Sequence, residues 1–341
     1  METLILEKPG QLVAGDRPEP AAPGAGEALV RIHRVGVCGT DLHAYHGRQP
    51  FFAFPRVLGH ELGVEVVEVG EGVEHLKAGD RCCVEPYLNC GTCIACRNGK
   101  PNCCEAISVL GVHQDGGMTQ QLLLPARKLH PSASLSHDQL ALIEPLAIGC
   151  HAVARGNPQA GETVLVIGAG PIGMAVIQFA LEREARVIVM DINDERLDFC
   201  RRQLGVQLTL RADAEDVLAE LRALGDGDLP TAVFDATGSP AAMHKSFELP
   251  AHGGRIVFVG LFQGQLSFED PLFHRRELTI MGSRNALPGD FTRIIRLIEE
   301  GRIDTNPWIT HRAPLGEVPG LFGDWANPAT GVRKAMIHVT E

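Results

Sequence analysis

The sequence predicts a two-domain α/β protein, and three observations lead to this expectation. The chain has 341 residues, more than twice the roughly 150 residues of a typical domain. Residues 1–145 are rich in glycine, proline and short apolar runs, which favours a β-rich domain with many turns. Beyond about residue 140, short apolar runs alternate with helical patterns, which is typical of a parallel sheet with helices on both faces.

The individual elements follow from these patterns. In the first part, no long helical period occurs before about residue 137, and strands are expected at 27–38, 61–70 and 118–125. In the second part, buried strands are expected at 162–168, 185–191, 231–238, 254–260 and 278–282, and helices at 172–184 and 194–205. Residues 290–341 return to mixed helix and strand, so they are expected to rejoin the first domain.

The amino-acid composition limits the kinds of molecule that the protein is expected to bind. The net charge of −11 opposes binding to nucleic acid or to an anionic membrane, because both need a basic surface. The N-terminus lacks the pattern of a secretory signal, and no run reaches the ~20 apolar residues of a membrane span. We therefore expect a cytoplasmic protein, in which ten cysteines are not five disulfides and clustered ones bind metal.

A glycine-rich motif predicts a dinucleotide site. Gly168-Ala169-Gly170-Pro171-Ile172-Gly173 follows an expected strand and opens an expected helix. The first glycine permits the tight turn, the second lets the backbone approach a pyrophosphate, and the third allows close packing of helix and strand. The free N–H groups of the helix N-terminus then face the phosphate. A Rossmann domain that carries a flavin, S-adenosylmethionine or no ligand is the alternative.

An acidic residue favours NAD over NADP. Asp191 ends the next expected strand, about 20 residues beyond the glycines, where its carboxylate can accept hydrogen bonds from the adenosine ribose. The same charge repels a 2′-phosphate. Arg196 lies nearby and weakens this preference.

The segment YLNCGTCIACRNGKPNCC predicts a structural metal site. Cys90, Cys93, Cys96 and Cys104 offer four thiolates, which suit tetrahedral zinc with no open position. Such a metal would stabilise a loop with too few apolar residues to fold alone. An iron–sulfur cluster is the rival, and Cys103 could replace Cys104 as the fourth ligand. The remaining cysteines apart from Cys38 are expected to be small buried side chains: Cys82, Cys83, Cys150 and Cys200.

A second set of residues predicts a catalytic metal site. Cys38, His60 and Glu61 come from two short motifs, and Glu144 lies just before the nucleotide half. Three or four protein ligands that leave room for a substrate oxygen are the design of a catalytic zinc site.

Together, these motifs resemble the zinc-dependent medium-chain dehydrogenases over essentially the full chain. The resemblance implies a GroES-like β-rich catalytic domain at 1–146 and 290–341, interrupted by a Rossmann NAD-binding domain at 147–289. It also implies two zinc ions per chain, oxidation of an alcohol with NAD, and a homo-oligomer, either tetramer or dimer. The motifs stand in the family's order: C-G-T-D-x-H at 38–43, G-H-E at 59–61, the four cysteines, E-P-L-A at 144–147, and G-A-G-P-I-G at 168–173.

The chain departs from alcohol dehydrogenases in one ligand. Glu144 stands where those enzymes place a second catalytic cysteine. This resembles the sorbitol and threonine dehydrogenase branch, in which Glu144 would bind zinc directly or through water while Glu61 moves on and off the metal. Val64 also stands where the family's G-H-E-x-x-G pattern has glycine, and Gly63 precedes it.

The resemblance assigns roles to neighbouring residues as well. Zinc would lower the pKa of the substrate hydroxyl, and hydride would pass to the nicotinamide. Thr40 and His43 resemble members of a proton relay to solvent, for which a near-neutral pKa suits histidine. Asp41 resembles the carboxylate that orients the zinc-bound His60.

The substrate is expected to be a polyol or sugar acid. The segments 44–56, 111–117 and 281–286 resemble those of bacterial dehydrogenases of the L-galactonate type. An L-threonine dehydrogenase, a simple alcohol dehydrogenase and a catalytically silent NAD(P)-binding sensor or structural protein are the alternatives. Polar groups that could meet substrate hydroxyls or a carboxylate are Arg48, His113, Gln114, Arg284 and Asn285.

Overall fold

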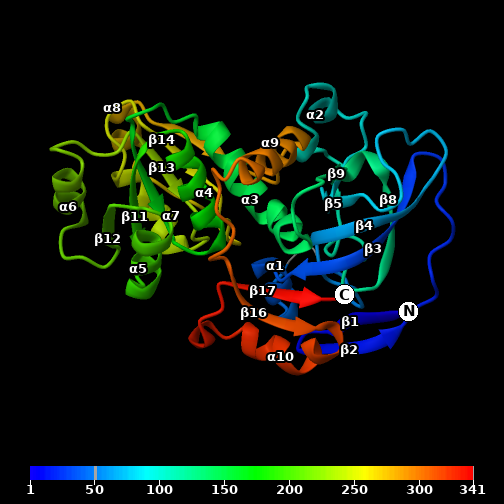
Figure 1. Cartoon of the computed structure of the whole chain (residues 1–341). Helices are drawn as coiled ribbons and strands as arrows, with labels where there is room; N and C mark the ends of the chain where they lie inside the picture. The colour runs from blue at the N-terminus through cyan, green and yellow to red at the C-terminus, as the bar shows by residue number, and fades with distance from the viewer. Residues whose placement is uncertain (50–51, 341) are drawn as a thin grey trace. The chain divides into compact units, whose positions relative to one another are not determined.

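The computed structural model describes residues 1–49 and 52–340, and Figure 1 shows its two compact units. One unit comprises Met1–Pro145 and Leu287–Glu341, and the other comprises Leu146–Ala286. Each unit has its own sheet and hydrophobic core. The predicted α/β class, with one β-rich and one doubly wound domain, is confirmed. None of the helices in the described residues is both long and apolar enough to span a membrane.

The β-rich unit is built on a sheet in the order β16-β17-β3-β4-β5-β9, with β8 also paired to β3. Two smaller ladders, β1 with β2 and β6 with β7, complete its strands among the described residues. The strands are β1 (Glu2–Lys8), β2 (Gln11–Asp16), β3 (Glu27–Gly36), β4 (Glu61–Val69), β5 (Arg81–Val84), β6 (Tyr87–Leu88), β7 (Ser108–Val109), β8 (Gln121–Pro125), β9 (Leu129–Pro131), β16 (Ile309–Pro314) and β17 (Lys334–His338).

Helices of this unit connect or cover the strands. The C-terminal part of the chain rejoins the first part through β17, which pairs with β3 in the middle of the sheet (Figure 1). The helices are α1 (Gly39–Tyr45), α2 (Ile94–Arg97), α9 (Pro288–Glu299) and α10 (Val318–Trp325), with short 3-10 turns at Pro101–Cys103, Ala126–Lys128, Leu315–Glu317 and Pro328–Thr330. Helix α3 (His137–Gly156) begins in this unit and continues into the other.

Strand β3 shows why the sheet forms. Its burial alternates, with Val30 and Ile32 fully buried and the charged Arg31 between them half-buried, as period-2 strands require. It pairs with β4, β8 and β17, so both its edges are hydrogen-bonded. This central strand ends at Gly36, two residues before the predicted ligand Cys38.

The second unit contains a parallel sheet in the order β12-β11-β10-β13-β14-β15. The strand order reverses between β10 and β13, which is where ligands bind in sheets of this kind. The sequence patterns did not predict β12, α6, α7 or α8, which are short. The elements are β10 (Thr163–Ile167), α4 (Pro171–Glu182), β11 (Arg186–Asp191), α5 (Asp194–Gln203), β12 (Leu208–Arg211), α6 (Val217–Leu224), β13 (Ala232–Asp235), α7 (Pro240–Lys245), a 3-10 turn at Ser246–Glu248, β14 (Arg255–Phe258), α8 (Asp270–Arg276) and β15 (Thr279–Gly282).

Candidate metal centres and nucleotide site

Cys38 is held at the start of helix α1. Its side chain accepts a hydrogen bond from the amide of Thr40, while its own amide donates to Asp41 Oδ2 at 2.9 Å. This reciprocal cap fixes the thiol where β3 passes into the helix. Thr40 and His43 are three residues apart on α1, so they share one face; Thr40 is half-buried and His43 is exposed.

His60 and Glu61 lie at the start of β4, next to the segment 111–118. Backbone hydrogen bonds join Gly116 to Val57 and Met118 to Leu58, and the Val57 amide donates to Asp115 Oδ1 at 3.0 Å. This segment therefore braces the backbone at Val57 and Leu58, just before His60. At Gly63, which precedes the unusual Val64, a Cβ would lie 2.1 Å from the carbonyl oxygen of His137, so this close backbone approach requires glycine.

Glu61 forms a buried ion pair with Lys334 of β17. Lys334 Nζ lies 2.6 Å from both carboxylate oxygens and donates to the Val37 carbonyl at 3.2 Å. A Cβ at Gly36, the residue paired with Glu61, would lie 2.1 Å from Glu61 Oε2. The carboxylate thus occupies the space that this glycine leaves, and the ammonium holds it there.

The ligand atoms of Cys38, His60 and Glu61 all lie within 4.8 Å of one another. A thiol, an imidazole and a carboxylate are the donor set that zinc uses in catalytic sites. His60 and Glu61 are buried and Cys38 is half-buried. The residues present therefore fit a zinc ion that keeps an open position.

The negative charges around His60 favour a positive charge at this position. Burial by itself would lower the pKa of His60, but the negative charges of Cys38 and Asp41 outweigh burial and raise it well above the ordinary value. His60 Nδ1 lies 3.8 Å from Asp41 Oδ1, and both atoms are buried without a hydrogen-bond partner among the described residues. The predicted orienting contact is thus an approach of opposite charges without a hydrogen bond.

Glu144 is buried on α3 and accepts a hydrogen bond from the Tyr87 hydroxyl. It is not one of the three residues whose ligand atoms lie within 4.8 Å of one another. Burial raises the pKa of Glu144, while the charge of His60 lowers it. The structure therefore holds this carboxylate by Tyr87, in the electrostatic field of His60.

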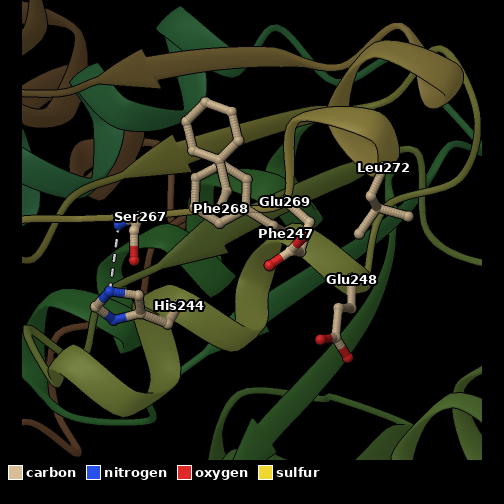
Figure 2. Close-up of a pocket in the computed structure, with 7 residues that line it drawn as sticks. All are labelled: His244, Phe247, Glu248, Ser267, Phe268, Glu269 and Leu272. Atoms are coloured by element: carbon tan, nitrogen blue, oxygen red, sulfur yellow. Dashed lines mark hydrogen bonds between the residues drawn. The ribbon is translucent and has the colours of Figure 1, made fainter.

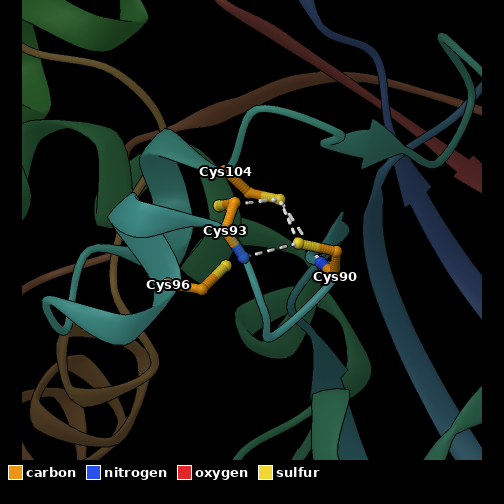
Figure 3. A group of neighbouring side chains, drawn as sticks. All are labelled: Cys90, Cys93, Cys96 and Cys104. Carbon is orange, nitrogen blue, oxygen red and sulfur yellow. Dashed lines mark hydrogen bonds between the residues drawn. The ribbon is translucent and has the colours of Figure 1, made fainter.

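The four predicted cysteines converge in one loop (Figure 3). Cys104 Sγ lies 3.5 Å from Cys90 Sγ and 3.9 Å from Cys93 Sγ. A zinc ion with metal–sulfur distances of about 2.3 Å requires sulfur–sulfur distances of about 3.8 Å. The described cysteines form no disulfide, so these thiols are available to a metal.

The loop of residues 90–104, called the cysteine lobe below, supplies hydrogen bonds to its own sulfurs. Bonds from the Thr92 hydroxyl and amide and from the Cys93 amide lower the pKa of Cys90 to about 6. This favours the thiolate that metal binding needs. Cys104 is buried in the group and Cys103 is exposed outside it, whereas the four cysteines expected to be buried are buried: Cys82, Cys83, Cys150 and Cys200.

The glycine motif forms the turn between β10 and α4. Gly168 has φ +92°, and a Cβ at Gly173 would lie 1.7 Å from the Gly168 carbonyl oxygen. A Cβ at Gly170 would find only Arg196 Nη1, at 3.9 Å, within 4 Å. Helix α4 begins at Pro171, followed by Ile172, with no side-chain cap at its N-terminus. The turn thus has the required strain and packing and leaves open space beside its second glycine.

Asp191 ends β11 and is buried beside this turn. Its carboxylate accepts the Ala169 amide at 2.6 Å and the Asn193 amide at 2.8 Å, and Arg196 Nη1 lies 4.0 Å away. Asp191 therefore also shapes the turn itself.

The substrate candidates are divided between the two units. Arg48 and His113 are exposed in the β-rich unit, and His113 Nδ1 accepts the Val109 amide at 3.0 Å. Gln114 is half-buried, with a buried amide nitrogen that has no hydrogen-bond partner in the part of the chain that the structure describes. Arg284 is exposed and Asn285 half-buried, both in the second unit.

Cys38, His60, Glu61 and Glu144 are called the buried centre below. Two residues that contact it were not predicted from the sequence. Lys334 is a lysine beside an apolar run, a signal that could have marked it as a buried charge. Tyr87 is one of only two tyrosines, but nothing in its spacing indicates contact with Glu144.

A separate pocket of about 170 Å³ lies in the second unit (Figure 2). The Ser267 amide donates to His244 Nε2 there, at 3.3 Å. Its lining includes neither the glycine motif nor Asp191, and it is smaller than the ~300 Å³ at which ligand pockets begin. The residues that line it are His244, Phe247, Glu248, Ser267, Phe268, Glu269 and Leu272.

Comparisons with known proteins match this arrangement. Residues 24–134 match the family described as alcohol dehydrogenase GroES-like domain, and residues 171–300 match that described as zinc-binding dehydrogenase. The chain is 48% identical to L-galactonate-5-dehydrogenase of Escherichia coli (strain K12), over 94% of each chain. It is 33% identical to 2-dehydro-3-deoxy-L-galactonate 5-dehydrogenase of Pseudoalteromonas atlantica, over 93% of each chain.

A solved structure extends the likeness to three dimensions. The alcohol dehydrogenase RspB of E. coli CFT073, crystallised with NADH, matches with a TM-score of 0.92 and 32% identity over 99% of each chain. The chain therefore belongs to the zinc-dependent medium-chain dehydrogenases and is an NAD(P)-linked oxidoreductase that acts on alcohols.

Proposed function

We propose that this enzyme oxidises a secondary hydroxyl of a sugar acid of the L-galactonate type, or of a related polyol, to a ketone with NAD. The observation that carries the proposal is 48% identity to an L-galactonate-5-dehydrogenase over nearly the whole chain. The second relative is also named as a 5-dehydrogenase of a galactonate derivative. The hydroxyl at C5 is therefore the first candidate.

Cys38, His60 and Glu144 would hold the catalytic zinc, and Glu61 would alternate between the metal and Lys334. The distances within 4.8 Å among the ligand atoms of Cys38, His60 and Glu61 support the roles of these three, and the buried ion pair supports the second position of Glu61. The role of Glu144 rests on its burial and on its electrostatic interaction with His60. When bound, zinc supplies Lewis acidity that lowers the pKa of the substrate hydroxyl. The chain itself fixes the ligands and excludes water around His60 and Glu61.

The proposed reaction breaks one C–H and one O–H bond of the substrate. The hydride would leave the hydroxyl-bearing carbon for nicotinamide C4, the proton would reach solvent, and a ketone and NADH would remain. Half-buried Thr40 and exposed His43 share a face of α1, so they suit transfer of that proton outward.

Asp191 and the glycine turn would bind NAD. The turn leaves space at Gly170, and Asp191 adds negative charge near it. The cysteine lobe would hold a second, structural zinc ion, which the sulfur spacing supports. The substrate contacts of Arg48, His113, Arg284 and Asn285, the cytoplasmic location and the homo-oligomer stay predictions.

The test follows NADH absorbance in zinc-loaded enzyme with NAD and a panel of alcohols. We expect the highest kcat/KM for L-galactonate, with less for L-gulonate and sorbitol, and for each substrate a higher kcat/KM with NAD than with NADP. Preference for L-threonine or ethanol would replace the sugar-acid assignment. No turnover with any of these substrates would favour the silent nucleotide-binding alternative.

A further inference from the structure

Tyr87 lies where the cysteine lobe joins the rest of its unit. Strands β6 and β7 flank the lobe and pair Tyr87 with Val109 and Leu88 with Ser108. The Leu110 amide also donates to the Pro86 carbonyl at 3.1 Å. This ladder, called the neck below, closes the loop at its base.

From the neck, Tyr87 reaches Glu144. The side chains are 57 positions apart in sequence, both are buried, and the phenol donates to Glu144 Oε1. Among the described residues, no other hydrogen bond to the Glu144 carboxylate is present. Tyr87 therefore fixes one carboxylate oxygen and leaves the other free for a metal.

The Tyr87 ring has rigid surroundings. Its edge packs on fully buried Phe291, with ring centroids 6.2 Å apart, and His130 stacks on the same phenylalanine at 5.1 Å. His130 Nε2 lies 3.3 Å from Glu85 Oε2, and Glu85 also pairs with buried Lys128. The contact with Phe291, which is itself held by His130, restrains the Tyr87 ring on one side.

The lobe fixes the other side of the neck. Asn89 donates to Cys96 Sγ at 3.6 Å and accepts from Arg127 at 2.9 Å. The Cys90 amide donates to Cys104 Sγ at 3.3 Å. Residues two and three positions after Tyr87 are thus hydrogen-bonded to the sulfurs that would bind metal, so a metal in the lobe restrains the neck.

We propose that Tyr87 is a positioning residue that orients Glu144 for the catalytic metal and makes this orientation depend on the metalated cysteine lobe. The inference rests on the proposed function only in taking Glu144 as a ligand. The two centres are then energetically coupled through one hydroxyl.

The first experiment measures how tightly each of the two metals is held in Tyr87→Phe, by chelator competition and by the visible spectrum of cobalt-substituted enzyme. Losing a partner that orients a metal ligand typically costs 10- to 100-fold in affinity or activity. We expect about 10-fold weaker binding of the catalytic metal and an altered cobalt spectrum. The lobe metal should lose less affinity, because coupling between two binding sites is reciprocal. Tyr45→Phe is the matched control and should change neither, since Tyr45 packs on Phe322.

A double-mutant cycle with Glu144→Gln separates this inference from the proposed function. If Tyr87 acts through Glu144, adding Tyr87→Phe to Glu144→Gln costs little further affinity. Equal losses in both backgrounds, or wild-type affinity and spectrum in Tyr87→Phe, would overturn the inference alone. Wild-type affinity in Glu144→Gln would instead overturn the assignment of Glu144, and the inference with it.

The second experiment tests the link to the lobe. Cys93→Ser should weaken binding at the catalytic centre in the wild-type background and have a much smaller effect in Tyr87→Phe. If Cys93→Ser does not fold, Arg127→Ala, which releases Asn89, gives the same comparison with a smaller effect. An equal loss with and without the Tyr87 hydroxyl, or no loss in either background, would contradict the coupling.

Discussion

The cysteine lobe and the buried centre around His60 both gather metal-binding side chains, but by opposite means. The lobe takes all its ligands from residues 90–104, leaves Cys90 exposed, and stabilises the thiolates with its own amides. The buried centre draws Cys38, His60, Glu61 and Glu144 from segments far apart in sequence. It also contains a protein cation, Lys334.

This difference indicates that the cysteine lobe has a structural role and the buried centre a catalytic role. A loop with local ligands and little core is held together by its metal. A centre enclosed by β3, β4, β17 and α3 is held by the fold, and its own cation balances the charge of Glu61 before any metal binds. Changes in the lobe should therefore act first on stability, and changes in the buried centre first on catalysis.

The largest expected effect comes from removing a ligand of the buried centre. His60→Ala should lower kcat about 1000-fold, equivalent to about 4 kcal/mol, because the metal that supplies Lewis acidity is lost. The melting temperature and the lobe metal should change little. If the activity of His60→Ala stayed within tenfold of wild type, the buried centre would not be catalytic, and the proposed functional difference between it and the cysteine lobe would be wrong.

Lys334→Met tests whether the buried centre carries its own cation. Removing one partner of a buried ion pair costs about 3–5 kcal/mol in general. We expect this loss in metal-free protein and a smaller one in zinc-loaded protein, where Glu61 can turn to the metal. Denaturant unfolding with and without zinc measures both losses.

Lys128→Met is the matched control for that variant. Lys128 is as buried as Lys334 and pairs with Glu85, which is not a proposed ligand. Its destabilisation should be about equal with and without zinc in the catalytic centre. If Lys334→Met behaved in the same way, Lys334 would be an ordinary structural cation.

Cys93→Ser should act on stability more than on chemistry. Loss of the lobe metal should lower the melting temperature by about 10 °C, if the cost is about 3 kcal/mol at 2–4 °C per kcal/mol. The kcat of the folded fraction should fall much less than in His60→Ala. Thermal unfolding and active-site titration check this, and an unchanged melting temperature would contradict a stabilising role for the lobe.

The smallest expected effect comes from a histidine pair outside the two metal centres, which makes the stability of the fold depend on pH. His33 and His137 stack with ring centroids 3.9 Å apart, and burial together with the His33 charge lowers the pKa of His137 to about 4. Between that value and the ordinary ~6.5, the unfolded chain binds more protons than the folded one, so stability falls as pH falls.

For this histidine pair, solvent screening limits the loss to about 1 kcal/mol or less. His137→Gln should make unfolding of metal-free protein less sensitive to pH over that interval. A pH dependence equal to that of wild type would show that the pair does not contribute.

What could be predicted from the sequence follows the same division between local and distant contacts. The cysteine spacing, the glycine turn and the longer strands are local patterns, and the structure contains the expected longer strands and the sulfur cluster. Lys334 and Tyr87 act across 273 and 57 positions, and no local period encodes such contacts. Short elements such as β12 and α7 were missed because four to six residues carry little periodicity.

We propose that the chain has one structural and one catalytic metal centre. The most direct test of this proposal is the metal content of purified enzyme, measured by elemental analysis in wild type and two variants. We expect two zinc ions per chain in wild type and one each in His60→Ala and Cys93→Ser, with measurable turnover only in wild type and in the folded fraction of Cys93→Ser. One zinc ion in wild type, or iron with acid-labile sulfide in the lobe, would contradict it.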